Sequence, residues 1–468
     1  MIDDGALDEL RGGLSGRVFL PSDAGYDDAR EIFNAMHDKR PAVVARCAST
    51  DDVVACVHAA RRTGVLVAVR CGGHSGAGNS TCQGGIVIDL ADLGRVEVDP
   101  EARTAHAGGG VLWREFDAAT QAHGLHTPGG RISTTGIGGF TVGGGYGWTS
   151  SKYGLTCDNL LSAEVVLADG SVVRASADEN AELFWGLRGG GGNFGIVTEF
   201  EFRLHPLGPI VFAGLALWPI DRASEVMSAW REIVDEAPDE LSTSTVILTA
   251  PPEEFVPDHL KGQAALGMGV MYVGDPEAGV DVVQPLKDLA PAVDLIGPMP
   301  YTAFQAIADP SMPHGMRSYW RGEYLNSLTD DAISTFTAHA PGLQAAGVPF
   351  SQIGFFRLGQ AIQAVPDDAT AFSHRDANYI LHPVSMWADP ADDEHVISAN
   401  RAFCETMRPF TTGAPYLNWT GEDRVREAFG DEKYARLVEL KDRYDPDNLF
   451  RLNQNIRPST RTGQPAPA

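Results

Sequence analysis

The chain has 468 residues, with 62 acidic side chains against 36 basic ones and a formal net charge of −26. Binding to nucleic acid or to an anionic membrane surface needs clustered Lys and Arg, so this balance argues against both as partners. Hydrophobic residues make up 43% and charged residues 21%, which is typical of an ordered globular protein, and the length is enough for several domains.

The sequence carries no obvious signal for a membrane, a metal or an oxidising compartment. No apolar run approaches the ~20 residues needed to span a bilayer, and residues 1–4 carry neither a basic leader nor an apolar stretch. The six cysteines follow no regular framework, and neither CxxC nor HExxH occurs. We therefore expect a cytoplasmic protein with free thiols and no metal site.

The first two hundred residues alternate between strand-like and helix-like segments. An apolar run at residues 42–45 is followed by a helix expected to begin near Ser49 and to end at Gly64. Residues 65–69 are apolar on both faces, as in a buried strand, and residues 85–90 form another strand-like run. Strand, helix and strand at this spacing predict α/β units.

Later segments change in character. Asp169-Gly170 predicts a hairpin between residues 162–167 and 171–175, and residues 196–202 alternate like a strand with one buried face. From about residue 206 glycine thins out. Helix-like residues 222–235 and strand-like residues 266–273 then predict a separate α+β domain.

That domain runs to about residue 411. The tail holds a charged helix at residues 422–444, and Asp445 to Asn448 mark its end. Residues 459–468 are expected to form a frayed terminus.

The most informative motif is Arg70-Cys71-Gly72-Gly73-His74-Ser75-Gly76-Ala77-Gly78, directly after a predicted buried strand. Successive glycines let backbone N–H groups converge on an anion, and Arg70 would add charge at the edge. The same residues could form a tight turn in which His74 only hydrogen-bonds. A hydrolase nucleophile elbow is a poorer reading, because Ala77 replaces its last glycine and a strand, not a helix, follows. A Rossmann fingerprint is also a poor match.

Two further clusters are unusually rich in glycine. One contains Gly136-Ile137-Gly138-Gly139 and Gly143-Gly144-Gly145-Tyr146-Gly147, and the other runs from Arg188 to Gly195. Any single cluster could be structural. Three of them in one half of the chain predict one extended ligand, such as a dinucleotide, that approaches the backbone closely.

Near the C-terminus, Tyr416-Leu417-Asn418 is a candidate strand. The period of two would place Tyr416 and Asn418 on one face, where both could hydrogen-bond a substrate hydroxyl or a cofactor ring edge. A buried Tyr with a satisfied hydroxyl is the structural alternative.

With these motifs in place, the chain resembles the berberine-bridge-enzyme-like flavoproteins of the vanillyl-alcohol-oxidase superfamily, which have a PCMH-type FAD-binding domain. The matching motifs cover most of the chain. They include Gly72-Gly73-His74-Ser75, Lys152-Tyr153-Gly154-Leu155, Leu183-Phe184-Trp185-Gly186, Tyr444-Asp445-Pro446-Asp447-Asn448 and Leu452-Asn453-Gln454-Asn455. The middle of the chain matches more loosely.

The resemblance implies an α+β protein with a two-part FAD-binding domain, residues 1–205 and 412–468. An α+β substrate domain, residues 206–411, is inserted between the two parts, and its antiparallel sheet, covered by helices, roofs the flavin. The family's covalent histidine falls on His74, where a neutral imidazole would bond to the flavin 8α carbon. The bond prevents flavin loss and raises its reduction potential. The position of the second, cysteinyl link of many relatives is Ile132 here, so a single link of the bacterial type is expected.

The glycine clusters and the resemblance together predict a set of cofactor-binding residues. These are Arg70, Cys71, Gly72, Gly73, His74, Ser75, Gly78, Thr135, Gly136, Gly138, Gly139, Gly143, Gly144, Tyr146, Gly195, Ile196, Val197, Tyr416, Asn418 and Asn453.

The predicted activity is that of an FAD-dependent oxidoreductase. A small organic substrate would give a hydride to the flavin, Tyr416 would take the proton, and dioxygen would receive the electrons. His382, Trp387, Tyr319 and Arg357 are possible lining residues of the substrate site. Sugars, amines, phenols and polyketide-type products of secondary metabolism all stay open as substrates. A dehydrogenase with another acceptor, or a flavin-binding protein without turnover, are the alternatives.

Overall fold

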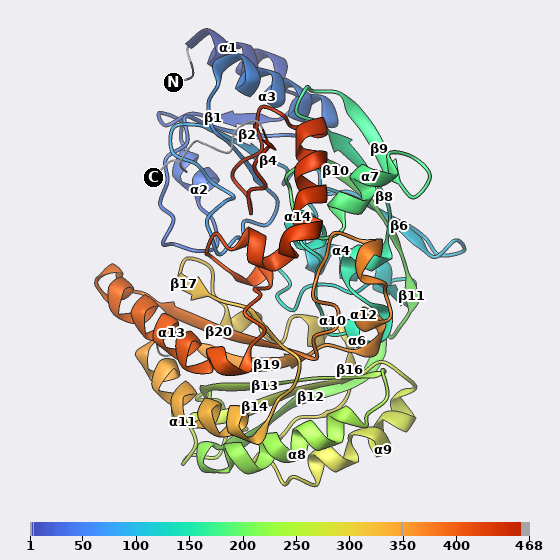
Figure 1. Cartoon of the computed structure of the whole chain (residues 1–468), viewed down its shortest axis with the longest axis vertical. Coiled ribbons are helices and arrows are strands. Elements are labelled where there is room, and N and C mark those ends of the chain that lie inside the picture. Colours follow the sequence, from blue (N-terminus) through green and yellow to red (C-terminus); the bar gives the residue numbers. More distant parts are fainter. Residues whose placement is uncertain (1, 3, 348–349, 460–468) are drawn as a thin grey trace.

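The computed structural model describes residues 2, 4–347 and 350–459. Figure 1 shows two halves, one built from both ends of the chain and one from its middle, with α14 (Val425–Tyr444) lying among the N-terminal elements. Helices and antiparallel strands are both abundant, so the predicted α+β class is confirmed. Most of the predicted frayed terminus, residues 460–468, lies outside the described residues, and the predicted boundaries at residues 206 and 411 stay a prediction.

The first sheet comes from the N-terminal α/β units. Its order is β1-β2-β4-β3, and β2, β4 and β3 run parallel. The bounds are β1 (Arg17–Phe19), β2 (Val43–Arg46), β3 (Val67–Arg70), β4 (Ile86–Asp89) and the crossover helix α3 (Thr50–Thr63). The Ser49 side chain accepts a hydrogen bond from the Asp52 N–H at the start of α3, and Gly64 ends the helix with φ 66°. Both predicted helix ends are confirmed.

The second sheet is antiparallel, in the order β5-β6-β10-β8-β9. The predicted hairpin at Asp169-Gly170 is confirmed, since β8 pairs with β9 and Gly170 takes φ 87° between them. The strands are β5 (Val96–Asp99), β6 (Thr104–Gly108), β8 (Leu160–Val166), β9 (Val172–Ser176) and β10 (Ile196–Arg203). Phe200 and Phe202 of β10 pack here with Trp113 and Phe116.

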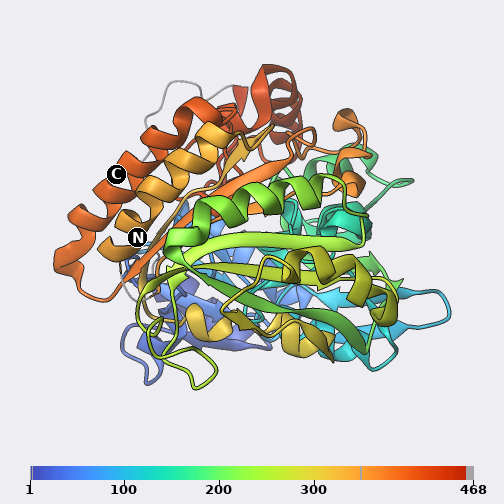
Figure 2. The same ribbon diagram turned by 90° about the horizontal axis from the view of Figure 1, so that it is seen from below.

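The middle of the chain forms a large sheet whose main path is β15-β12-β14-β13-β19-β20-β17, with β16 beside β12 and β18 beside β20. Its strands are β12 (Ile210–Pro219), β13 (Leu241–Thr249), β14 (Ala264–Tyr272), β15 (Val293–Asp294), β16 (Gly297–Pro300), β17 (Arg317–Trp320), β18 (Glu323–Leu325), β19 (Gln352–Arg357) and β20 (Tyr379–Trp387). The helices α8 (Ala223–Asp235), α9 (Pro276–Lys287), α11 (Asp330–Ala346) and α13 (Asp393–Met407) cover one face (Figures 1 and 2). The other face looks toward the first half.

Short elements complete the chain. They are α1 (Asp4–Gly13), α2 (Tyr26–Arg30), α4 (Trp113–Gln121), β7 (Leu125–His126), α5 (Ile137–Val142), α6 (Ser150–Tyr153), α7 (Ala181–Leu187), β11 (His205–Pro206), α10 (Tyr301–Gln305) and α12 (Gln360–Gln363). All six cysteines are free. Among the described helices, none combines the length and the apolar character needed to cross a membrane.

A buried ion pair ties the C-terminal helix to the N-terminal half. Lys441 of α14 lies 2.7 Å from Asp445 and also donates to the carbonyls of Asn193 and Phe450. Burial lowers the pKa of Lys441, while the Asp445 carboxylate raises it. Gly430, with φ 69°, interrupts the helical backbone of α14, so the predicted continuous helix at residues 422–444 is kinked.

His126 is a fully buried histidine close to the point where the chain leaves the first half. It lies in β7, which pairs with β11, and its Nδ1 is 3.2 Å from the His205 carbonyl oxygen. Tyr153 and Tyr301 pack edge-on against its ring. Burial lowers the pKa of His126 to about 3, so the folded protein keeps this imidazole neutral.

This burial predicts an acid-sensitive stability. Below pH ~6.5 the unfolded chain protonates His126 and the folded protein does not, so the free energy of unfolding falls as the pH drops from about 6.5 to about 3. At pH 5 the loss from this residue is about 2 kcal/mol relative to pH 7. Urea unfolding at pH 7, 6 and 5 measures this loss in the free energy of unfolding. His126→Gln is expected to show a shallower pH slope and the exposed His123→Gln an unchanged one; equal slopes for both would contradict the assignment.

Candidate functional site

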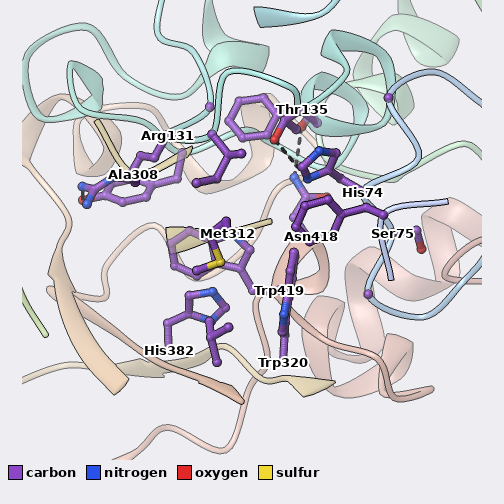
Figure 3. A pocket seen from close by; sticks show the side chains of 18 of the residues that line it. His74, Ser75, Arg131, Thr135, Ala308, Met312, Trp320, His382, Asn418 and Trp419 are labelled. Atoms are coloured by element: carbon purple, nitrogen blue, oxygen red, sulfur yellow. Dashed lines mark hydrogen bonds between the residues drawn. The ribbon is translucent and has the colours of Figure 1, made fainter. Parts of the chain in front are cut away.

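A cavity of about 1140 Å³ lies between the two halves. The glycine-rich segments and residues of the C-terminal part line one side, and strands β13, β14, β19 and β20 line the other. Small-molecule sites usually measure about 300–1,000 Å³, so this space can hold a dinucleotide together with a second molecule. Figure 3 shows His74 and Thr135 on one side of the cavity and His382 and Trp320 on the other.

The first glycine cluster follows β3 and forms part of the cavity wall. Within the described chain, the backbone N–H groups of Gly73, His74 and Ser75 have no hydrogen-bond acceptor. A Cβ on Gly72 would lie 2.4 Å from the Gly136 nitrogen, and a Cβ on Gly136 would lie 2.3 Å from the Gly72 nitrogen. Glycine is required at both positions because the two segments pack backbone against backbone, and the free N–H groups suit an oxygen-rich ligand.

His74 faces the cavity from this cluster. Its ring stacks on Phe33 with centroids 4.1 Å apart, and its Nε2 lies 2.9 Å from the Thr134 hydroxyl oxygen. Nδ1 lies 3.5 Å from the Thr135 hydroxyl oxygen (Figure 3). Enclosure by protein lowers the pKa of His74 to about 3, so the imidazole stays neutral at physiological pH. A neutral, oriented imidazole keeps a nucleophilic lone pair.

The structure corrects the role expected for Arg70. Its guanidinium lies 2.8 Å from the buried Asp89 carboxylate and donates to the backbone carbonyls of Ala29 and Glu31. It does not line the cavity. Since its charge is already neutralised by Asp89, Arg70 anchors the end of β3 and is not available to bind an anion.

Most of the other predicted cofactor residues do line the cavity. These are Cys71, Gly72, Gly73, Ser75, Thr135, Gly136, Gly138, Gly139, Gly143, Tyr146, Gly195, Ile196, Val197, Asn418 and Asn453. Gly78 and Gly144 do not: each takes a positive φ, and a Cβ would strike the His37 ring at Gly78 and the Phe372 ring at Gly144. They are turn and packing positions. The Asn453 side-chain oxygen is buried without a partner in the described chain, which leaves an acceptor for a bound group.

Tyr416 and Asn418 do not form the predicted strand. Residues Leu417–Trp419 are a short 3₁₀ helix, with Tyr416 preceding it. Even so, Asn418 Nδ2 lies 3.2 Å from the Tyr416 hydroxyl and 3.0 Å from the Phe140 carbonyl oxygen. Asn418 lines the cavity and Tyr416 does not.

The buried position of Tyr416 does not support its expected role as a base. Its hydroxyl accepts hydrogen bonds from the Gly145 N–H and from Asn418, and its ring packs among Tyr324, Phe372 and Trp419. Burial raises the pKa of its phenol above the ordinary value. A general base must reach the proton it takes. Tyr416 instead orients Asn418, because its oxygen holds the Asn418 amide.

Of the four possible lining residues predicted from the middle of the chain, only His382 lines the cavity. Trp387 donates from its indole nitrogen to Asp393, and Tyr319 donates from its hydroxyl to Glu422. Both side chains are therefore engaged in contacts away from the cavity. Arg357 does not line the cavity either. The alternation along β20 explains the difference, since Tyr379 and Leu381 point to the helix-covered core while His382 and Val384 face the cavity.

His382 is held as a neutral hydrogen-bond acceptor. Its Nδ1 lies 2.7 Å from the Arg321 carbonyl oxygen, so Nδ1 carries the proton and Nε2 keeps its lone pair. The ring stacks on Trp419 with centroids 4.1 Å apart and planes 16° apart. Burial lowers the pKa of His382 to about 4; the hydrogen bond to the Arg321 carbonyl opposes this shift, and the positive charge of Arg131 contributes to it.

Sequence reasoning missed Arg131 and most of the aromatic residues around it; of these only Tyr146 was among the predicted site residues. The Arg131 guanidinium carbon lies 3.6 Å from the Trp148 ring centroid, 4.5 Å from that of Phe356 and 5.0 Å from that of Tyr146. All four residues line the cavity, as do Trp320 and Trp419. The only signal in the sequence was that Arg131 is a lone charged residue shortly before the glycine cluster that begins at Gly136.

The residues of the cavity wall fit an FAD. The free N–H groups, the backbone approach at Gly72 and Gly136 and the orphaned Asn453 oxygen suit a long, oxygen-rich dinucleotide. His74 and Asn418 lie on the same wall, in reach of a planar ring. Among the described residues, no group of three or more His, Cys, Asp or Glu side chains is placed to hold a metal ion.

Comparison with known proteins agrees with this geometry. Residues 41–176 match the family model described as "FAD binding domain", and residues 406–457 match "Berberine and berberine like". FAD-linked oxidoreductase pgmH of Aspergillus terreus is 32% identical, over 95% of this chain and 94% of its own length. (R)-6-hydroxynicotine oxidase of Paenarthrobacter nicotinovorans is 29% identical over 95% and 97%.

Two solved structures share the whole fold. The crystal structure of 6-hydroxy-D-nicotine oxidase from Arthrobacter nicotinovorans superposes with a TM-score of 0.84 at 28% identity, covering 95% of this chain and 98% of that one. Glucooligosaccharide oxidase from Acremonium strictum superposes with a TM-score of 0.85 at 24% identity, covering 97% and 99%. The chain thus belongs to the berberine-bridge-enzyme-like FAD-linked oxidoreductases.

Proposed function

We propose that this oxidoreductase is an oxidase whose FAD is bonded through His74 alone and which oxidises a small organic molecule. The observation that carries the proposal is the cavity-facing His74 imidazole, kept neutral by enclosure and oriented by Phe33 and Thr134. Glucooligosaccharide oxidase from Acremonium strictum is described with a 6-S-cysteinyl, 8α-N1-histidyl FAD, so a histidyl bond to flavin exists on this fold.

A single bond is proposed because no cysteine occupies the place of a second one. Ile132 lines the cavity at the position expected for the cysteinyl link. The Cys71 thiol points to the Val111 carbonyl oxygen, 3.5 Å away, and burial raises its pKa to about 12. Cys157 is buried in a separate cluster with Tyr146 and Leu155 and does not line the cavity. Neither thiol is therefore a ready nucleophile.

The side chains around the cavity supply the proton chemistry. FAD, when bound, accepts a hydride from the substrate and later returns the electrons to an acceptor. His382 is the proposed base: its free Nε2 takes the proton from the substrate hydroxyl or amine while the Nδ1–H stays bonded to the Arg321 carbonyl. Trp419 fixes the imidazole plane by stacking. The aromatic walls exclude water from the reacting atoms.

The electron acceptor is proposed to be dioxygen, with hydrogen peroxide as the product. The support is the naming of relatives as oxidases, including (R)-6-hydroxynicotine oxidase. The cytoplasmic location and a role in secondary metabolism stay predictions from the sequence.

The covalent link has a direct test in His74→Ala. Wild-type protein is expected to keep its yellow flavin in the pellet after acid precipitation. The variant is expected to bind FAD through the backbone N–H groups and to release all of it into the supernatant, because the tether is gone. Flavin fluorescence of denaturing gels gives the same readout. His37→Ala, which removes a nearby imidazole outside the cavity lining, should stay fluorescent; a fluorescent His74→Ala band would overturn the assignment.

The proposed base is tested by His382→Asn, whose amide can still donate to the Arg321 carbonyl but has no group at the Nε2 position. With a substrate found by peroxide screening, kcat/KM is expected to fall by about 100-fold or more while the flavin stays covalently bound. Wild-type kcat/KM should fall as the pH drops through about 4, because His382 then becomes protonated.

Tyr416→Phe is the matched control for this prediction. It removes the hydroxyl that orients Asn418 but no group that lines the cavity, so kcat/KM should change by less than about tenfold. The opposite ranking, with Tyr416→Phe nearly inactive and His382→Asn active, would restore Tyr416 as the base.

A further inference from the structure

Arg131 is a charged side chain whose charge no part of the described chain balances. Within the described residues, no carboxylate lies within 4 Å of its guanidinium. Two arginines that are more deeply buried are paired: Arg70 lies 2.8 Å from Asp89, and Arg375 lies 2.6 Å from Asp158. Enclosing a charge without a partner is costly, so an unpaired guanidinium in a cavity wall points to a ligand that completes it.

The contacts of Arg131 fix its orientation and leave donors free. Tyr146 donates its hydroxyl hydrogen to the Arg357 carbonyl oxygen at 2.7 Å, so the phenol oxygen is an acceptor for Arg131 Nη2 at 3.1 Å. This is the single hydrogen bond of the guanidinium within the described chain, and Nε has no partner. A guanidinium has five N–H groups, so donors remain on its two terminal nitrogens for a ligand.

The charge persists at working pH. Burial lowers the pKa of Arg131 to about 10, and the neighbouring Tyr146 phenol acts in the opposite direction. The guanidinium is still protonated at neutrality. Its face rests on Trp148 and Phe356, which stabilise the cation by cation–π contact without neutralising it.

The aromatic residues that line the cavity near Arg131 indicate the shape and polarity of the ligand. His382 and Trp419 form a stacked pair, and Phe356 lies 5.1 Å from Trp419 and 6.0 Å from His382, between centroids. Trp320 packs edge-on against His382. Flat, apolar walls of this kind bind a planar, conjugated molecule better than a heavily hydroxylated one.

From these contacts, and resting on the oxidase function proposed above, we propose that the substrate is a planar organic anion whose carboxylate, phenolate or enolate oxygen pairs with Arg131. A carboxylate can accept two parallel N–H bonds from the guanidinium fork. His382 then faces the oxidisable hydroxyl or amine of the same molecule, so Arg131 is a substrate-positioning residue and His382 the proton acceptor.

The test uses the flavin-loaded enzyme and two probes of the same shape, 2-naphthoate and its neutral analogue 2-naphthamide. Binding is followed by the change in the visible flavin spectrum and by the shift in Tm. Wild-type protein is expected to bind 2-naphthoate at least tenfold more tightly than 2-naphthamide. Arg131→Met should weaken 2-naphthoate at least tenfold and leave 2-naphthamide unchanged. Arg131→Lys keeps the charge but lacks the guanidinium fork, so its affinity for 2-naphthoate should lie between those of wild type and Arg131→Met.

Arg357→Met is the control, since it removes a similar side chain that does not line the cavity, and both probe affinities should stay at the wild-type values. Equal binding of the two probes by wild type, or no binding of either, overturns the proposal. So does an Arg131→Met variant with wild-type probe affinities but an altered flavin spectrum, which would make Arg131 a flavin contact.

The two proposals fail in different ways. Protein without covalent flavin, or flavin-loaded protein that yields no peroxide with any substrate, counts against the oxidase function. Flavin-loaded, peroxide-producing enzyme that does not distinguish the two probes counts against the anion site alone.

Discussion

The close approach of two glycine-rich segments underlies the whole site. At Gly72 and Gly136 the backbones are so near that a single methyl group on either would lie within 2.4 Å of the other chain segment. This contact joins the end of the parallel sheet to the segment that leads into α5, and it sets the position of His74 relative to Thr134 and Thr135. Because the cavity wall here is backbone, its shape cannot drift with side-chain rotamers.

The opposite wall of the cavity consists of side chains from the large sheet. Strands β13, β14, β19 and β20 contribute alternate side chains to the cavity and the remaining ones to the helix-covered core, as Phe355 and Phe356 show. Substituting a cavity-facing residue changes the ligand contacts while the core on the other face keeps the sheet in place. The fold can therefore keep one cofactor and exchange substrates, so function has to be read from the residues of this wall.

The same division explains what the sequence could predict. The helix caps at Ser49 and Gly64 and the Asp169-Gly170 hairpin are local signals, and the structure confirms the elements that they predict. The roles expected for Arg70 and Tyr416 fail because of partners distant in the sequence, namely Asp89 and the Gly145 backbone. Sequence cannot show such neutralisation, nor that Trp419 and not Tyr416 would line the cavity. The sequence could not single out Arg131, because what distinguishes it is spatial: no carboxylate of the described residues lies beside its guanidinium.

Charge is distributed unequally around the cavity. Near the first glycine cluster, burial keeps His74 neutral, and Asp89 cancels the charge of Arg70. Near His382, the Arg131 guanidinium stays charged beside a neutral imidazole and disfavours its protonation. An anionic substrate at Arg131 would offset that effect and raise the pKa of His382, because the two opposite charges largely cancel at the imidazole. The bound substrate would then make His382 a stronger base. Anion binding at Arg131 and proton removal by His382 would therefore be coupled electrostatically.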